Sequence, residues 1–375
     1  MMKRILLSVV LMSVAAVASA QSYYVDAANP EILRFGDYRE AQRKEIVIPS
    51  QVNGYNVCKA DLHTHSVYSD GSVSPQFRVK EAWLEGLDVI AVTEHIEYRP
   101  FENEFGEYLH ADLKKDRDLN AAVKLAQREG AYWDVFIIPG TEITRDGTTV
   151  GHFNALFTQD NNKVYDDDPV QAIRNAKAQG ALVMHNHPGW WRTSIDFTEA
   201  EKIAYGEGLI DGIETMNGPE FYPKAIERAQ ELGLFVTANT DVHSTTGIDF
   251  PVEHGGRNMT LVFAKEKSLE AVREALEECR TISYSYKNLA GDEQLLKDLF
   301  NACITFEPVR LDYKQRQIFN ITNHSSIPFA LRVNGSNVFW VDPFTTVQTK
   351  ARNPKLTVVN MWYGVEKHPV VEVTF

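Results

Sequence analysis

The 375-residue chain is poor in cysteine, in positive charge and in long apolar runs. Its three cysteines, Cys58, Cys279 and Cys303, have no metal-like spacing, which excludes a cysteine-rich metal framework. One disulfide is possible in an oxidising compartment, but the sequence does not choose a pair, and Cys58 is expected to be a buried thiol. The formal charge of -13 disfavours long nucleic acids, which bind to basic surfaces. The 44% hydrophobic content is sufficient for a sizeable core.

One apolar run stands out, and it lies at the start of the chain. Lys3 and Arg4 precede it, and an Ala-Ser-Ala sequence ending at Ala20 follows it. A charged start, a short apolar stretch and small residues are typical of an export signal, and the run is short for a membrane span. We expect a signal peptide over residues 1–20, no membrane span elsewhere, and a protein that is exported to the periplasm or secreted.

The most informative stretch runs from Asp61 to Gly71, with the sequence DLHTHSVYSDG. His63 and His65 are two residues apart, so on a strand they point to the same face. Asp70 follows in a Ser-Asp-Gly turn, and imidazoles with a carboxylate suit a divalent metal. The alternative is a strand end with two surface histidines, and further ligands elsewhere in the chain are needed to decide.

From residue 57 onward, apolar runs of strand length alternate with amphipathic helices. Ser74-Pro75 and Asp168-Pro169 each place an N-cap before a proline, and Thr198 with Glu201 has capping-box spacing. This alternation predicts a parallel sheet closed as an α/β barrel. The expected strands are 87–93, 135–139, 152–157, 181–184, 212–216, 234–238 and 259–263.

Chemistry in such barrels gathers at the C-terminal ends of the strands, and the polar residues of this chain follow that rule. Glu94-His95, Glu142, His187, and Asp241 with His243 each follow an apolar run, whereas His152 opens one. A lone histidine at a strand end is more often structural. Several elements that each bring a histidine or carboxylate to one barrel end predict metal binding.

These motifs resemble those of the polymerase and histidinol phosphatase (PHP) superfamily, in the family's order and over roughly residues 57–290. The matching motifs are His-Thr-His…Ser-Asp-Gly, Val-Thr-Glu-His, Pro-Gly-Thr-Glu-Ile, Gly-His-Phe, Asn-His-Pro and Asp-Val-His. The resemblance implies a distorted (β/α)7 barrel with two or three divalent ions (zinc, manganese or iron), with Glu142 as a bridging ligand. Glu94 departs from the family's usual Asp but need not be a ligand. The implied ligands are His63, His65, Asp70, His95, Glu142, His152, His187, Asp241 and His243.

The chain is also similar to the exported phosphodiesterases of this superfamily, through Asn-His-Pro-Gly-Trp at 186–190 and His-Gly-Gly-Arg-Asn-Met-Thr at 254–260. This similarity implies hydrolysis of a small phosphodiester by a hydroxide shared between metals. Glu142, Asp241 and His243 are the expected catalytic residues. Arg192, Arg257 and Trp190 are the expected substrate contacts, with a structural salt bridge as the alternative for each arginine and rim packing as the alternative for the tryptophan.

After residue 291 the pattern changes to a helix followed by short strand-like runs separated by turn signals such as Asn334-Gly335. The expected organisation is a lead-in over 21–56, the PHP barrel over 57–291, and a connecting helix with a small C-terminal β-sandwich over 292–375. Three alternatives to the diesterase stay open: a phosphomonoesterase, a nuclease for short oligonucleotides, and a non-catalytic binding protein of the cell envelope. The oligomeric state is not predicted.

Overall fold

The computed structural model describes residues 31, 41–49, 51–101, 118–250 and 257–375. The chain divides into two compact units, residues 1–42 and 43–375, and the helices and strands described belong to the second unit. The predicted signal peptide over 1–20 lies outside the described residues, as does most of the predicted lead-in up to residue 40. Within the described part of the chain, no helix is both long enough and apolar enough to cross a bilayer.

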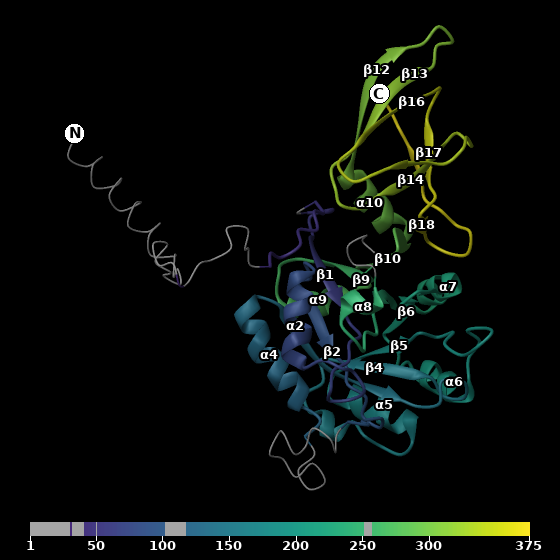
Figure 1. Cartoon of the computed structure of the whole chain (residues 1–375). Coiled ribbons are helices and arrows are strands. Elements are labelled where there is room, and N and C mark those ends of the chain that lie inside the picture. The colour runs from purple at the N-terminus through teal and green to yellow at the C-terminus, as the bar shows by residue number, and fades with distance from the viewer. Residues whose placement is uncertain (1–30, 32–40, 50, 102–117, 251–256) are drawn as a thin grey trace, which may run out of the picture. The chain divides into compact units, whose positions relative to one another are not determined.

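A twelve-stranded sheet forms the frame of the second unit (Figure 1). Its order is β18-β11-β10-β9-β1-β2-β3-β4-β5-β6-β7, and β8 also pairs with β6. The bounds are β1 (Asn56–Asp61), β2 (Val89–Val92), β3 (Phe136–Thr144), β4 (His152–Leu156), β5 (Leu182–Asn186), β6 (Gly212–Asn217), β7 (Glu220–Phe221), β8 (Phe235–Asn239), β9 (Met259–Ala264), β10 (Thr281–Ser285), β11 (Asn288–Gly291) and β18 (Met361–Trp362).

The sheet is mixed, so the predicted parallel pairing holds for only part of it. Strands β1, β2 and β3 are parallel, as are β5, β6 and β8, but β4 runs antiparallel to both of its neighbours. The connection from β3 to β4, residues 145–151, carries no helix, and a short connection of this kind joins antiparallel strands. His152 therefore begins β4 at the same sheet edge where the neighbouring strands end.

The sheet curls until β8 lies against β9 and β10, which gives the distorted barrel that the sequence predicts. Ala238 N–H donates to Thr260 Oγ1 at 3.0 Å, and Val236 N–H donates to Thr281 Oγ1 at 3.1 Å. Every residue of β8 and β9 is buried. Strands covered on both faces read as continuous apolar runs rather than alternating ones, as these do.

The helices begin where the sequence predicts. Ser74 Oγ accepts from Phe77 N–H at the start of α2 (Pro75–Leu84), and Thr198 forms the capping box with Glu201 at the start of α6 (Glu199–Gly206). These caps are local, so the sequence alone determines them. The other helices of the barrel are α4 (Ala121–Trp133), η1 (Asn161–Lys163), α5 (Pro169–Ala178), α7 (Pro223–Leu232), α8 (Thr246–Asp249) and α9 (Leu269–Glu277).

The C-terminal β-domain follows α10 (Glu293–Cys303) and contains two antiparallel sheets, β12-β13-β16 and β15-β14-β17-β19. Phe319 of one sheet and Phe329 of the other belong to one buried apolar cluster. Strand β18 instead joins the barrel sheet, where it pairs in parallel with β11. The bounds are β12 (Ile304–Leu311), β13 (Gln317–Asn323), β14 (Phe329–Val333), β15 (Phe339–Val341), β16 (Thr346–Ala351), β17 (Lys355–Val358) and β19 (Val370–Glu372).

The three cysteines are free thiols. Cys58 is completely buried on β1, as predicted, and burial raises the pKa of its thiol to about 11. The sequence left one disulfide possible, and the structure contains none among these three residues.

Candidate metal centre

His63 and His65 follow the end of β1 and occupy the centre of a buried cluster of possible metal ligands. Their Nε2 atoms lie 3.1 Å apart. Asp241 Oδ1 lies 3.1 and 3.0 Å from these two nitrogens, and Glu142 Oε2 lies 3.6 and 3.5 Å from them. Four ligands bound tetrahedrally at about 2.0–2.2 Å from an ion are separated by roughly 3.3–3.6 Å. His63 Nε2, His65 Nε2 and Asp241 Oδ1 are therefore close enough together to bind one divalent ion, and Glu142 Oε2 lies beside this group.

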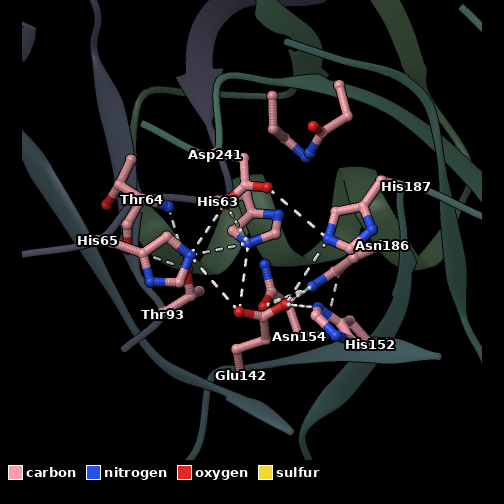
Figure 2. A network of polar contacts seen from close by, with 12 residues as sticks. His63, Thr64, His65, Thr93, Glu142, His152, Asn154, Asn186, His187 and Asp241 are labelled. Carbon is pink, nitrogen blue, oxygen red and sulfur yellow. Dashed lines mark hydrogen bonds and ion pairs between the residues drawn. The ribbon is translucent and has the colours of Figure 1, made fainter. Parts of the chain in front are cut away.

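The backbone explains why both imidazoles reach the same place. The two residues were predicted to lie on a strand, and they lie just beyond it, with Thr64 between them bridged in parallel to Val242. This bridge continues the extended pairing past the end of β1, so side chains two residues apart share a face. Figure 2 shows the result: in this view Asp241 lies above the two imidazoles and Glu142 below them.

A second group of possible ligands lies beside the first. Asp70 Oδ1 is 3.3 Å from His95 Nε2 and 3.2 Å from His243 Nε2. The His65 ring lies next to both imidazoles, with ring centroids 4.3 Å from His95 and 4.4 Å from His243. Asp70 lies in the β1–α2 loop, His95 follows β2, and His243 follows β8. Three segments distant in sequence thus converge on a second position for an ion.

A third group lies on the other side of Glu142. His187 Nε2 is 3.9 Å from Glu142 Oε1 and 3.7 Å from Asp241 Oδ2, and His152 Nδ1 is 3.2 Å from the same Glu142 oxygen. The other ring nitrogen of His152 lies 2.7 Å from the backbone carbonyl of Arg145. A proton on Nε2 would donate to this carbonyl and leave Nδ1 free to bind a cation.

The two central carboxylates each connect neighbouring groups. Glu142 directs Oε2 toward His63 and Oε1 toward His152, and Asp241 directs Oδ1 toward His63 and Oδ2 toward His187. Glu142 Oε2 is buried, and although His95 Nδ1 lies 2.6 Å from it, this contact lacks hydrogen-bond geometry, so the oxygen has no hydrogen-bond donor among the described residues. A buried carboxylate oxygen needs a partner, and a divalent cation supplies one. The donor set of imidazoles and carboxylates fits zinc, manganese or iron.

Burial and neighbouring charges shift the pKa values of these groups away from their ordinary values. Burial alone would raise the pKa of the Glu142 carboxyl, but the His95 and His63 imidazoles hold it well below its usual range. Burial alone would lower the pKa of His95, but Glu142 and Asp70 raise it to about 10. Burial and neighbouring imidazoles lower the pKa of His187 to about 4 and of His65 to about 3. The carboxylate of Glu142 is therefore ionised and the imidazoles of His65 and His187 are neutral, whereas a metal ion would have to displace the proton of His95.

Sequence reasoning missed Glu214, which supports the cluster from behind. Its Oε1 lies 3.0 Å from His63 Nδ1, and its Oε2 accepts from His187 N–H at 2.6 Å and from Asn217 Nδ2 at 2.8 Å. A carboxylate hydrogen-bonded to the far nitrogen of a ligating histidine fixes the ring and its tautomer. The signal available in the sequence was an acidic residue in the middle of the run Gly212–Asn217, and the structure shows that this residue is completely buried.

Glu94 is not among the converging ligand atoms. Its carboxylate accepts from Ser66 N–H at 3.1 Å and from Ser69 Oγ at 2.5 Å, which braces the loop after β1. His185 directly precedes the Asn-His-Pro motif, but it neither contacts a ligand candidate nor faces solvent. It is completely buried against Glu201 and Tyr205, away from the pocket.

A pocket of about 670 Å³ opens over the cluster, and aromatic side chains form much of its wall. Trp190 packs near His152 and His187, and the exposed Trp191 stacks on it with ring centroids 4.7 Å apart. Both tryptophans line the pocket, which is the position that the sequence analysis expects of Trp190 as a substrate contact. Sequence reasoning missed three further aromatic residues that line the pocket, namely Tyr98, Phe250 and Tyr286.

The two arginines expected to contact substrate are instead held by carboxylates. Arg257 is 4% exposed and pairs with Asp61 at 2.9 Å and with Glu85, and it does not line the pocket. Arg192 pairs with Glu201 at 2.7 Å and donates to the carbonyl of Gly147 at 2.5 Å. Buried guanidinium groups are stable only with such partners, so the structural alternative holds for both.

Arg145 is the arginine that lines the pocket among the described residues, and sequence reasoning missed it. It follows Glu142 by three residues, pairs with Glu97, and donates to the carbonyl of Asp166 at 2.6 Å. Its charge is therefore largely compensated.

Comparisons with known proteins agree with this geometry. The PHP domain family model matches residues 61–232. A Bacteroides vulgatus two-domain protein containing a predicted PHP-like metal-dependent phosphoesterase is 32% identical, with a TM-score of 0.81 over 90% of this chain and 100% of that one. An uncharacterized Methanocaldococcus jannaschii protein is 25% identical over 196 residues, 49% of this chain and 81% of its own length. The chain therefore belongs to the PHP family of metal-dependent phosphoesterases.

Proposed function

We propose that this phosphoesterase hydrolyses small phosphodiesters and that it uses two or three divalent ions of zinc, manganese or iron. The observation that carries the metal assignment is the convergence of His63 Nε2, His65 Nε2 and Asp241 Oδ1 to within 3.0–3.1 Å of one another, with two further groups of possible ligands beside them. The full proposed ligand set is His63, His65, Asp70, His95, Glu142, His152, His187, Asp241 and His243.

The pocket wall supports the diester over the monoester. A monoester dianion gains most from extra positive charge, whereas a diester carries a single charge and a second organic group. Arg145, the lining arginine, is already paired with Glu97, while Trp190 and Trp191 offer a broad aromatic surface. Burial of an apolar substituent contributes about 1.5–3 kcal/mol, roughly ten- to a hundredfold in specificity.

The proposed catalytic roles of Glu142, Asp241 and His243 are based on where their side chains lie in the cluster. Divalent ions bound in the cluster would supply an activated water and positive charge for the phosphoryl oxygens. Glu142 and Asp241 contact neighbouring ligand groups and so would set the separation of the ions. The side chain of His243 is 39% exposed, which makes it the proposed ligand that can approach the substrate from the rim. Trp190 would orient the ester substituent and exclude water from that side.

The test is a comparison of kcat/KM for an aryl phosphodiester and the matching aryl monoester, on metal-replete protein whose metal content has been measured by elemental analysis. We expect the diester to be favoured. A clear preference for the monoester would assign a phosphatase to the same site. Full metal occupancy without turnover of either ester would favour a binding protein.

We further propose that the protein is exported to the periplasm or secreted. The support is the sequence of residues 1–20, where Lys3 and Arg4 precede an apolar stretch and small residues end at Ala20.

A further inference from the structure

The hairpin that joins β10 to β11 has an unfavourable turn at the pocket wall. Ser285 pairs with Asn288, which leaves Tyr286 and Lys287 as the two turn residues. Their φ angles are +44° and +69°. Two-residue hairpins of this kind require positive φ at both positions and therefore strongly prefer Asn-Gly or Gly-Gly. A non-glycine residue with positive φ costs on the order of 1 kcal/mol or more and persists only where surrounding structure holds it.

The C-terminal β-domain holds this turn. Asn360 Nδ2 donates to the Lys287 carbonyl at 2.6 Å, and the Asn360 carbonyl accepts from Leu289 N–H at 2.9 Å. The Lys287 ammonium lies 5.7 Å from the centre of the Trp340 ring, within the range of a cation–π contact. Asn360 is 4% exposed, so its side chain is fixed. Strand β18 begins at the next residue and pairs with β11, which anchors the hairpin to the same segment.

The turn places one large side chain in the pocket. Tyr286 lines the pocket together with the metal-ligand candidates and Trp190, and it is 40% exposed. Tyr286 therefore borders the space that a substrate would occupy. A glycine at position 286 would relieve the backbone strain of the turn, but it would leave this part of the pocket wall open. The strained conformation is therefore found at a residue that lines the pocket.

We propose that Tyr286 contacts the organic substituent of the substrate and that the C-terminal β-domain, through Asn360, is a positioning element for this contact. The proposal rests on the proposed phosphodiesterase function and gives the β-domain a role in specificity although it contributes no metal ligand candidate. Tyr286 supplies apolar surface and a hydrogen-bonding hydroxyl. Asn360 acts at a distance by holding the backbone that carries the ring.

The experiment measures KM and kcat for an aryl phosphodiester on metal-replete wild type, Tyr286→Ala, Asn360→Ala and the double variant. We expect Tyr286→Ala to raise KM about tenfold with little change in kcat and in metal content, because apolar contact with the substituent is lost. Asn360→Ala should raise KM in the same direction. In the Tyr286→Ala background, Asn360→Ala should cause almost no further rise in KM, since both substitutions disrupt the same contact between Tyr286 and the substrate.

The matched control is Asn323→Ala. Asn323 is also buried and also ties turns of the β-domain together, through the carbonyls of Ile327 and Val341, but it does not contact the Tyr286 hairpin. The Asn323→Ala substitution should lower the stability of the protein while leaving KM unchanged. If Asn360→Ala does not fold, Trp340→Ala replaces it, because Trp340 is exposed and contacts the same turn through Lys287.

Two outcomes would overturn the proposal. The first is an unchanged KM in Tyr286→Ala, and the second is an additive effect of Asn360→Ala in its background. Wild type that turns over no diester would contradict the proposed function instead. Calorimetric binding of phenylphosphonate to wild type and to Tyr286→Ala would then decide the Tyr286 contact by itself, since loss of about tenfold in affinity supports it and equal affinity refutes it.

Discussion

His63 Nδ1 lies 3.0 Å from Glu214 Oε1, and both side chains are completely buried. The opposite nitrogen of the same ring faces Asp241 and Glu142. This arrangement orients a ligating imidazole through a carboxylate behind it, and loss of such partners typically costs ten- to a hundredfold in metal affinity.

Glu214→Gln is therefore expected to weaken metal binding about ten- to a hundredfold while the protein remains folded. The amide keeps the shape of the side chain but loses the charge that favours the His63 tautomer needed for binding. Metal titration followed by calorimetry measures the effect. Glu199→Gln, at an exposed carboxylate at the start of α6, is the control and should change nothing. Unchanged metal affinity in Glu214→Gln would show that Glu214 does not support metal binding through His63.

Glu142→Ala should lose metal and activity together. The two oxygens of Glu142 face different ligand groups, so one substitution disturbs neighbouring ion positions at once. Elemental analysis and turnover of an aryl diester on the same sample provide the measurement. Full metal occupancy with normal turnover would show that Glu142 is not a bridging ligand.

Trp190→Ala should narrow the preference for diester over monoester, chiefly by lowering kcat/KM for the diester by about ten- to a hundredfold. Its ring lies against His152 and His187, where the substituent of a bound ester would rest. Tyr132→Ala, at an exposed aromatic residue of α4, is the control. An equal loss for both esters would assign Trp190 to support of the metal ligands and not to specificity.

Glu201 should contribute to acid sensitivity. Burial alone would raise its pKa, but hydrogen bonds and charge from His185 and Arg192 lower it to about 2. A carboxyl whose folded pKa is depressed contributes stability above its unfolded pKa, near 4.3, and that stability is lost as the pH falls toward 2. The free energy of unfolding at pH 7 should fall by about 1–3 kcal/mol in Glu201→Gln.

Denaturant unfolding at pH 7, 5 and 3 tests this assignment. Wild type and Glu201→Gln should differ most at pH 7, and the difference should shrink toward pH 3, because the carboxyl is then protonated in the unfolded protein. A difference that stays constant across this range would mean that the ionised form of Glu201 is not the stabilising one.

Intact-mass measurement of the mature protein should show Gln21 at its start if the export signal is cleaved after Ala20. The expectation comes from the charged start, the apolar stretch and the small residues of positions 1–20. Met1 retained in protein isolated from the cytosol would contradict both the cleavage and the proposed localisation.

The sequence by itself determined the features that depend on local chemistry. The N-caps at Ser74 and Thr198 are set by residues within one helical turn, and the structure confirms both. Histidines and carboxylates at the ends of apolar runs indicated the site because barrel strands end at a common edge. His63 and Glu142 could be recognised in this way, since His63 follows β1 and Glu142 lies in the last residues of β3.

Only the tertiary structure decided which distant groups meet. The antiparallel direction of β4, which brings His152 to the ligand edge, depends on how the chain crosses the sheet and not on the composition of the strand. Arg192 looked like a substrate contact, yet Glu201 on the following helix holds it. Glu214 and Tyr286 were overlooked because their roles depend on contacts with residues distant in sequence, which only the folded structure shows. Long-range pairing of charges and hydrogen bonds is fixed by packing, so no local pattern in the sequence contains it.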